Sequence, residues 1–285
     1  MKKDKLRALL LFVDDAARSD TNWQVYHENS KIGRLAVQVQ AKIGENEDIH
    51  ASLLAAIGNQ RGRYPYHPKY PLDAADDNSR PGLTLRQALA KRRSKRKRHN
   101  APLPFQRVSE LLFHATRSTG RIAITPTDHI SVKCYPSAGS LYPVQTYLLV
   151  RDVDGMKPGF YYLDTDQTLL CRLSSLPDSH DWNTTFIHDR HAADAPLTIF
   201  MTAIVNRTSM KYGERAYRYC LLEAGHLSQN YLLLAEELGL HACPIGGFVE
   251  RDVENLLDID GIEEIAIYAL TVGMAAEDEG SDGPS

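Results

Sequence analysis

The chain has 285 residues, of which 43% are hydrophobic and 24% charged, and its formal net charge is −3. This composition is typical of a globular protein with one large domain, or one domain plus an appendage, and the near-neutral charge argues against bulk electrostatic binding of nucleic acid. No stretch approaches the ~20 apolar residues that cross a bilayer, and the apolar run Leu9–Val13 is too short for a signal peptide. The four cysteines form no CxxC pair, so we expect them to be reduced and the protein to be cytoplasmic.

The two ends of the chain differ in pattern from its middle. Residues 1–60 contain short amphipathic stripes, which predict a mainly helical N-terminal appendage, although the alternation in Gly33–Ile43 also permits a strand. Residues 61–83 contain several prolines and little periodicity, which indicates an extended linker or wrapping arm. The acidic, glycine-rich tail 275–285 is expected to be disordered.

Residues 84–274 are predicted to form the main domain. Its helices and strands occur in mixed order without a regular βαβ repeat, so the predicted fold class is α+β. The expected helices cover Thr84–Arg98, Phe105–Ala115 and the stretch from Lys211 to Leu238. The expected strands cover Gln145–Val150, Phe160–Leu163, Leu169–Leu173, Leu197–Val205 and Ile265–Val272, the second and third of them joined as a hairpin.

The stretch Lys211–Phe248 is predicted to organise this domain. Apolar residues recur at helical spacing from Tyr217 onward, and the opposite side is also largely apolar, which predicts a buried helix. Gly225 inside this helix costs about 1 kcal/mol relative to alanine, which suggests that something approaches its backbone closely. Gly239 is expected to end the helix in a left-handed conformation. The turn Pro244–Phe248 then holds two glycines whose backbone N–H groups could stay open to a flat ligand.

Several shorter motifs are ambiguous by themselves. The basic run Arg92–Arg98 is commonly a solvated face or a nonspecific nucleic-acid patch, but arginine guanidinium groups also suit phosphate. Tyr135–Pro143 (YPSAGSLYP) is by itself a turn before a strand, with a glycine that lets a ligand approach. His188 and His191 are too few to predict a metal site. Cys243 is expected to be a small buried filler rather than a redox thiol.

Three motifs in this order over Leu83–Gly273 closely resemble the SagB-type dehydrogenases. This family is the nitroreductase-fold branch found with azole-forming peptide synthetases. The N-terminal part matches only in fragments, Tyr26–Lys31 and Tyr64–Pro71. The three motifs are RRSKR at Arg92–Arg96, PSAGSLYP at Pro136–Pro143, and KYGERAYR with EAGH, QN and PIGGF within Lys211–Phe248.

The resemblance implies a nitroreductase-like fold, with a central mixed or antiparallel sheet flanked by helices. It also implies a homodimer that binds FMN at each subunit interface. The residues expected to hold the phosphate and the pyrimidine side are Arg92, Arg93, Ser94 and Arg96. A block expected from the partner subunit comprises Pro136, Ser137, Ala138, Gly139, Ser140 and Leu141. The residues expected near N5 and the C4 carbonyl of the flavin are Ile245, Gly246 and Gly247.

The reaction implied by the resemblance is oxidation of a thiazoline or oxazoline in a ribosomally made precursor peptide to the azole, with cyclodehydratase proteins as partners. Lys211 and Tyr212 match the pair to which the family's proton transfer is assigned. A lysine stays mostly protonated at pH 7 unless burial or nearby cations lower its pKa, and Arg215 and Arg218 are candidates for that role. The simpler alternative is an exposed Lys–Tyr pair at a helix start.

One departure and two alternative functions accompany this resemblance. Nitroreductase-fold proteins often place a basic residue shortly after the last strand, whereas acidic residues follow Val272–Ala275 here. The first alternative is an NAD(P)H-dependent nitro- or quinone reductase, which needs no base for an α-proton. The second is a non-catalytic scaffold subunit of an azole synthetase. The sequence predicts no metal, no membrane segment and no nucleic-acid partner.

Overall fold

The computed structural model describes residues 22–31, 62–73, 82–99, 101–123, 129–187 and 189–276. The predictions for most of the N-terminal appendage, including the strand considered at Gly33–Ile43, lie outside these ranges. So does the prediction for most of the acidic tail. No helix within the described residues is both long and apolar enough to cross a membrane.

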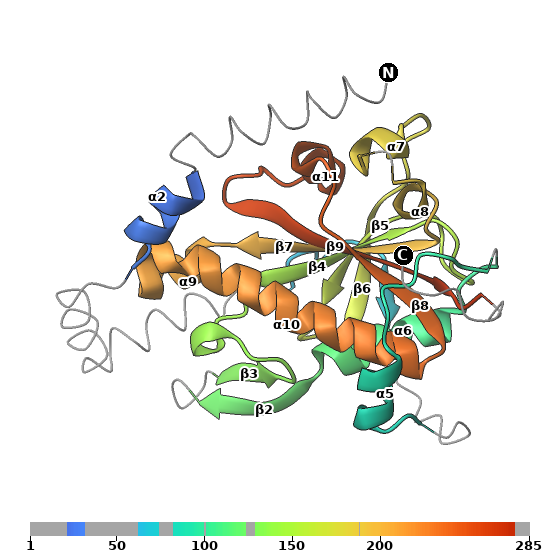
Figure 1. The fold of residues 1–285 in the computed structure, drawn as a ribbon, viewed down its shortest axis with the longest axis horizontal. Coiled ribbons are helices and arrows are strands. Elements are labelled where there is room, and N and C mark those ends of the chain that lie inside the picture. Colours follow the sequence, from blue (N-terminus) through green and yellow to red (C-terminus); the bar gives the residue numbers. More distant parts are fainter. Residues whose placement is uncertain are drawn as a thin grey trace, which may run out of the picture.

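A seven-stranded sheet forms the centre of the molecule (Figure 1). Its strand order is β1-β6-β5-β4-β7-β9-β8, and all neighbouring strands are antiparallel. The strands are β1 (Lys69–Pro71), β4 (Val144–Val150), β5 (Gly159–Asp164), β6 (Leu169–Ser174), β7 (Leu197–Ile204), β8 (Leu240–Ile245) and β9 (Glu264–Met274). A separate antiparallel hairpin joins β2 (Ser118–Ala123) to β3 (His129–Lys133). The predicted α+β class and the five predicted strands are confirmed.

Helices lie outside the sheet, and the longest of them, α10, runs across it (Figure 1). The described helices are α2 (Asn22–Asn29), α5 (Leu85–Lys91), α6 (Phe105–Thr116), α7 (Trp182–Thr185), α8 (Arg190–Ala193), α9 (Asn206–Tyr212), α10 (Ala216–Glu237) and α11 (Glu250–Leu257). Two short 3₁₀ turns, η1 (Ala138–Ser140) and η2 (Gly213–Arg215), interrupt the chain before β4 and before α10.

The core occupies both faces of the sheet. Strand β4 is buried at every residue, and alternate side chains of a strand point to opposite faces. Leu148 and Val150 pack in the cluster that contains α6 and α10, whereas Tyr147 and Leu149 pack in the cluster that contains α11. The central strand is therefore buried along its whole length because each face is covered.

Three details of the predicted long helix are wrong. The helix does not run on from Lys211, because Gly213 has φ 55° and separates α9 from α10. Its first half is buried on one side only, since Cys220 and Ala224 are buried whereas Leu221 and Leu222 are 43% and 56% exposed. The expected close approach at Gly225 is also absent, because no described atom comes within 4 Å of a Cβ placed there. The left-handed end at Gly239, with φ 65°, is confirmed.

The basic run is not helical as predicted. Helix α5 begins with a capping box at Thr84 and ends at Lys91, and the chain is extended from Arg92 onward. It then passes beside β8, where the Lys95 N–H donates to the Ala242 carbonyl at 3.0 Å. Like charges one helical turn apart repel each other, so the extended path relieves that repulsion. Strand β1 lies within the predicted linker and pairs with β6 at the edge of the sheet, a position that tolerates its proline.

Candidate functional site

Lys211 and Tyr212 face the turn that contains Gly139. A Cβ atom placed on Gly139 would lie 2.9 Å from the Tyr212 hydroxyl oxygen and 3.1 Å from Lys211 Nζ. Gly139 also has φ 63°, which a residue with a side chain adopts only with strain. The fold thus brings together two motifs that are far apart in the sequence, and glycine is the residue that lets them meet.

The Lys–Tyr pair is half-buried at the end of α9. Lys211 Nζ lies 5.5 Å from the centroid of the Tyr212 ring. The Tyr219 ring stands edge-on to the same ring, with the centroids 4.9 Å apart. Burial raises the pKa of the Tyr212 phenol, and Tyr219 adds to the rise. Tyr212 therefore keeps its proton at neutral pH and can donate a hydrogen bond.

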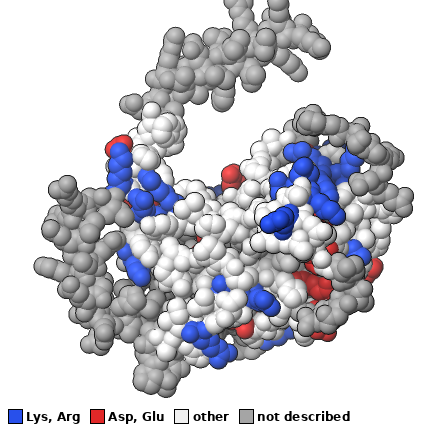
Figure 2. All heavy atoms as spheres, turned by 60° about the horizontal axis from the view of Figure 1, so that its bottom comes forward, with Lys and Arg blue, Asp and Glu red and all other residues white. Residues whose placement is uncertain are grey.

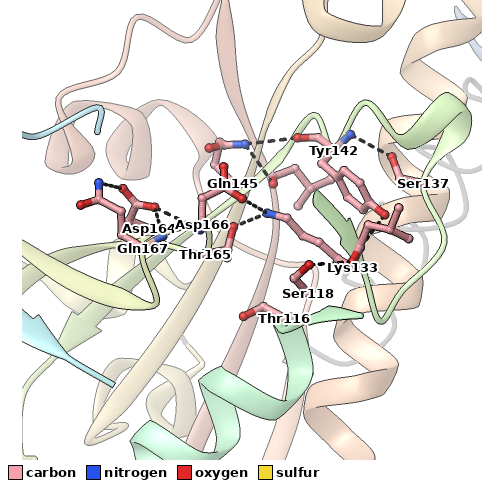
Figure 3. A network of polar contacts seen from close by, with 12 residues as sticks. Thr116, Ser118, Lys133, Ser137, Tyr142, Gln145, Asp164, Thr165, Asp166 and Gln167 are labelled. Atoms are coloured by element: carbon pink, nitrogen blue, oxygen red, sulfur yellow. Dashed lines mark hydrogen bonds and ion pairs between the residues drawn. The ribbon is translucent and has the colours of Figure 1, made fainter. Parts of the chain in front are cut away.

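A polar network holds the PSAGSLYP turn (Figure 3). The Tyr142 N–H donates to Ser137 Oγ at 2.9 Å, and the Tyr142 hydroxyl accepts the Lys133 backbone N–H at 2.8 Å. The Lys133 ammonium donates to the Thr165 hydroxyl, and burial lowers the pKa of this ammonium. These bonds fix the turn that presents Gly139.

A pocket opens beside this turn. Its walls come from β3, the PSAGSLYP turn, the β5–β6 turn and α9, and they include Lys133, Ser140, Asp164, Asp166 and Arg207. The sequence analysis identified neither Lys133 nor Arg207 as a site residue. Neither lies in a recognisable motif, and only the tertiary fold places them in one wall.

Glu223 of α10 is a buried carboxyl beside the same turn, with 2% of its surface exposed. Its Oε1 accepts the Val144 N–H at 3.2 Å. Burial raises the pKa of this carboxyl to about 7, against the opposing effects of its hydrogen bonds and of the positive charges on Lys133 and Arg207. Glu223 belongs to the EAGH motif, but the sequence analysis assigned it no role.

Glu223 should make stability depend on pH. Its folded pKa is raised above the unfolded value, so between these two values the folded state binds more protons and the free energy of unfolding falls as pH rises. Compared with the wild type, Glu223→Gln should therefore gain up to ~3 kcal/mol as pH rises from ~4 to ~8. Denaturant unfolding at several pH values measures this, with the exposed Glu214→Gln as control. A stability difference between Glu223→Gln and the wild type that does not change with pH would contradict this prediction.

The predicted phosphate residues lie beyond α5. Ser94, Arg93 and Arg96 are exposed, and Arg92 is half-buried. Lys95 forms an ion pair within the chain, because its Nζ lies 3.0 Å from the Glu236 carboxylate. Figure 2 shows Lys and Arg side chains gathered on the side of the molecule that carries α5 and β8. The three arginines are therefore positioned to meet an anion from solvent or from a second chain.

The glycine turn directly follows β8, the strand beside which the basic segment runs. Pro244 and Ile245 belong to β8 rather than to the turn, which corrects the prediction. Gly246 and Gly247 are exposed, and a Cβ placed on Gly246 would meet no described atom within 4 Å. The basic segment is bonded to β8 at Ala242. The distance along the extended chain from Ala242 to Gly246 is roughly 13 Å. The arginines and the open glycine backbone thus lie along one edge of the sheet.

The structure does not bring the basic segment to the Lys–Tyr pair within one chain. Lys211 precedes the start of α10, whereas Glu236, which holds Lys95, lies at its end. An α-helix of this length spans roughly 33 Å. The RRSKR motif and the Lys–Tyr pair therefore lie at opposite ends of α10 (Figure 1).

The described residues contain no group of three or more His, Cys, Asp or Glu side chains that could hold a metal ion. His188 itself lies outside the described ranges. All four cysteines are free, and Cys243 is fully buried. Burial raises the pKa of the Cys243 thiol, which is consistent with a structural role.

Comparisons with known proteins define the class. Residues 89–274 match the Nitroreductase family, and the chain belongs to this family. A protein of Methanocaldococcus jannaschii named as a nitroreductase is 31% identical over 68% of this chain and 93% of its own length. The trifolitoxin-processing protein TfxB of Rhizobium leguminosarum bv. trifolii is 23% identical over 89% of this chain and 67% of its own length.

Further relatives point to the branch of the family. The microcin B17-processing protein McbC of Escherichia coli is 29% identical over 44% of this chain and 48% of its own length. The structure of the E. coli microcin synthetase McbBCD complex contains a chain with the same fold, with a TM-score of 0.54, 17% identity, and coverage of 92% of this chain and 100% of that one. A nitroreductase-like structure from Anabaena variabilis has a TM-score of 0.62 and 26% identity, covering 75% of this chain and 43% of that one. The resemblance to SagB-type dehydrogenases is confirmed.

Proposed function

We propose that this protein is an FMN-dependent dehydrogenase that oxidises thiazolines or oxazolines of a ribosomally made precursor peptide to azoles. The observation that carries the proposal is the contact of Lys211 and Tyr212 with the turn at Gly139. The similarity to trifolitoxin- and microcin-processing proteins supports a peptide substrate and synthetase partners, including a cyclodehydratase. A reductase fed by a nicotinamide needs no base for an α-proton.

The residues present fit a flavin nucleotide. Arg92, Arg93 and Arg96 offer forked donors that match phosphate oxygens. Gly246 and Gly247 leave an open backbone next to a strand end, where N–H groups can meet a flat ring. Bound FMN supplies the two-electron hydride acceptor of the reaction.

The site is proposed to form between two copies of the chain. The turn at Gly139 contacts Lys211 and Tyr212, so these motifs move as one unit, while the arginines lie at the other end of α10. A homodimer would let one chain supply the arginines and the glycine turn and its partner supply this unit. Exposed apolar side chains on the first half of α10, such as Leu221 and Leu222, provide a surface for such a contact.

Within this site the Lys–Tyr pair would carry out the proton transfer. Conversion of an azoline to an azole removes the α-proton and a hydride from the neighbouring ring carbon. Lys211 in its neutral form would accept the α-proton, and the neutral phenol of Tyr212 would donate a hydrogen bond that orients the ring. Arg215 and Arg218 were expected to act on Lys211, but their hydrogen bonds go to Ser30, His27 and Tyr219 instead.

The first experiment is an absorbance spectrum of the purified protein, with mass identification of the molecule released by heat. Flavin bands and the mass of FMN, followed by azole formation from an azoline-containing peptide, would support the proposal. A protein that cannot be reconstituted with FMN would refute it in favour of a scaffold subunit. A flavoprotein that reduces quinones with NAD(P)H and leaves azolines unchanged would refute it in favour of a reductase.

Arg92→Ala should weaken the binding of FMN. Loss of a hydrogen bond to a charged phosphate should raise the Kd about 10- to 100-fold. Fluorescence titration of the apoprotein with FMN measures the change. Arg86→Ala, which removes an exposed arginine of α5 outside the RRSKR motif, should bind FMN as the wild type does. Equal affinity in the Arg92→Ala variant would place the phosphate elsewhere.

A further inference from the structure

The Tyr26–Lys31 segment docks on the junction between α9 and α10. Arg218 Nε donates to Ser30 Oγ at 2.8 Å, and Arg218 Nη2 donates to the His27 carbonyl at 2.8 Å. Arg215 Nη1 donates to the Ser30 carbonyl at 3.2 Å. Two arginines that immediately follow the Lys–Tyr pair in sequence thus hold one serine from the N-terminal part of the chain.

Ser30 is the buried anchor of this contact. Its exposure is 2%, whereas α2 contains no buried residue along its whole length. An isolated helix of eight residues is not stable in water. The Ser30 contacts, with the Tyr26 ring edge-on to Tyr217 at 5.6 Å, therefore hold α2 in place.

The same contacts continue to Tyr212. Arg215 Nε donates to the Tyr219 hydroxyl at 3.3 Å. The Tyr219 ring packs against the Tyr212 ring, with centroids 4.9 Å apart and planes at 71°. Ser30, Arg215, Tyr219 and Tyr212 thus form one continuous series of contacts.

We infer that Arg215 and Tyr219 are positioning residues for Tyr212, with Ser30 as their anchor. The inference rests on the proposed role of Tyr212 in azoline oxidation. Tyr212 is the last residue of α9, and Gly213 beside it has φ 55° with no described atom within 4 Å of a Cβ placed there. The Gly213 N–H donates to the Ser209 carbonyl and holds the backbone at this point, while the Tyr219 ring packs against the Tyr212 ring and restrains its orientation. A displacement of about 1 Å in a catalytic group can cost about 100-fold in rate.

The kinetic test compares Arg215→Met, Tyr219→Phe and the double variant with the wild-type holoenzyme. Each single variant should lower kcat for azoline oxidation about tenfold while KM and FMN content stay unchanged, because only the geometry of the pair is disturbed. The double variant should lose no more than the worse single variant, because both act through one series of contacts. Arg215→Lys should recover part of the loss. Unchanged kcat, or additive losses, would overturn the inference.

Lys31→Met is the matched control in the same segment. Lys31 forms its ion pair with the exposed Glu28 of the same segment, so this variant should behave as the wild type. If Lys31→Met lost as much kcat as Arg215→Met, any change in this segment would be enough to lower the rate. That result would overturn the specific role of Arg215 and Tyr219.

A second readout needs neither flavin nor substrate. Amide hydrogen exchange in residues 206–212 should be faster in Arg215→Met than in the wild type and in Lys31→Met, because the Tyr219 ring that packs against Tyr212 loses its hydrogen bond from Arg215. A wild-type protein that does not oxidise azolines would refute the proposed function alone, and the exchange rates would then decide the positioning. Unchanged exchange in Arg215→Met would overturn it.

Discussion

Lys211→Ala should lower azole formation about 10²- to 10⁴-fold, which is the usual contribution of a general acid–base group. The protein should keep its flavin, because the phosphate is proposed to be held by the arginines beyond α5 and not by Lys211. The KM for the peptide should change little, since the lost interaction acts on the transferred proton. Single-turnover reduction of the bound flavin by an azoline peptide measures the loss directly.

Lys157→Ala serves as the control, because Lys157 is exposed in the loop before β5, away from the Gly139 turn. It should retain the wild-type rate. Azoline oxidation at the wild-type rate in Lys211→Ala would refute the assignment of the Lys–Tyr pair. Quinone reduction should survive the same substitution, because hydride transfer between a nicotinamide and a quinone needs no α-proton base.

Gly139→Ala should lower azoline oxidation about 100-fold, because the new Cβ would lie 2.9 Å from the Tyr212 hydroxyl oxygen and displace both members of the pair. The backbone also has φ 63° at this residue, so a further loss of about 1 kcal/mol in the free energy of unfolding is expected. The expected loss of rate is therefore much larger than the small loss of stability would cause by itself. Steady-state kinetics and denaturant unfolding of the same preparation separate the two.

Gly155→Ala is a matched control for this substitution. Gly155 has φ 73°, but a Cβ placed there would meet no described atom within 4 Å. It should show the loss of stability that the positive φ imposes without the loss of activity. Equal activity in Gly139→Ala and Gly155→Ala would show that the contact between the turn and the Lys–Tyr pair does not matter for the reaction.

The arrangement of the motifs gives α10 a second role beside its packing in the core. One end of the helix follows the Lys–Tyr pair, and the other end holds Lys95 of the basic segment. The helix thus sets the distance between the proposed proton-transfer pair and the proposed phosphate residues of one chain. For this reason the proposed site requires a second copy, and dilution below the dimer dissociation constant should reduce flavin retention and activity together.

The fold class and five strands of the central sheet followed from the sequence, whereas β1 and β8 did not. Runs such as Gln145–Val150 and Leu197–Val205 are largely apolar because both faces of the central sheet are covered, and this pattern is visible locally. The left-handed end of α10 at Gly239 followed from local backbone chemistry in the same way. The order of the three motifs identified the family, which the match over residues 89–274 confirmed.

The contacts between distant segments were decided by the tertiary structure. Helical periodicity did not reveal the break at Gly213, because the residues on both sides of it favour a helix. The extended path of the basic run depends on its bond to Ala242 in β8, which no local pattern encodes. The pocket side chain Lys133 and the positioning residue Tyr219 owe their places to packing between elements. Sequence periodicity reports which side of an element is buried, whereas only the packed fold determines which buried or half-buried side chains meet.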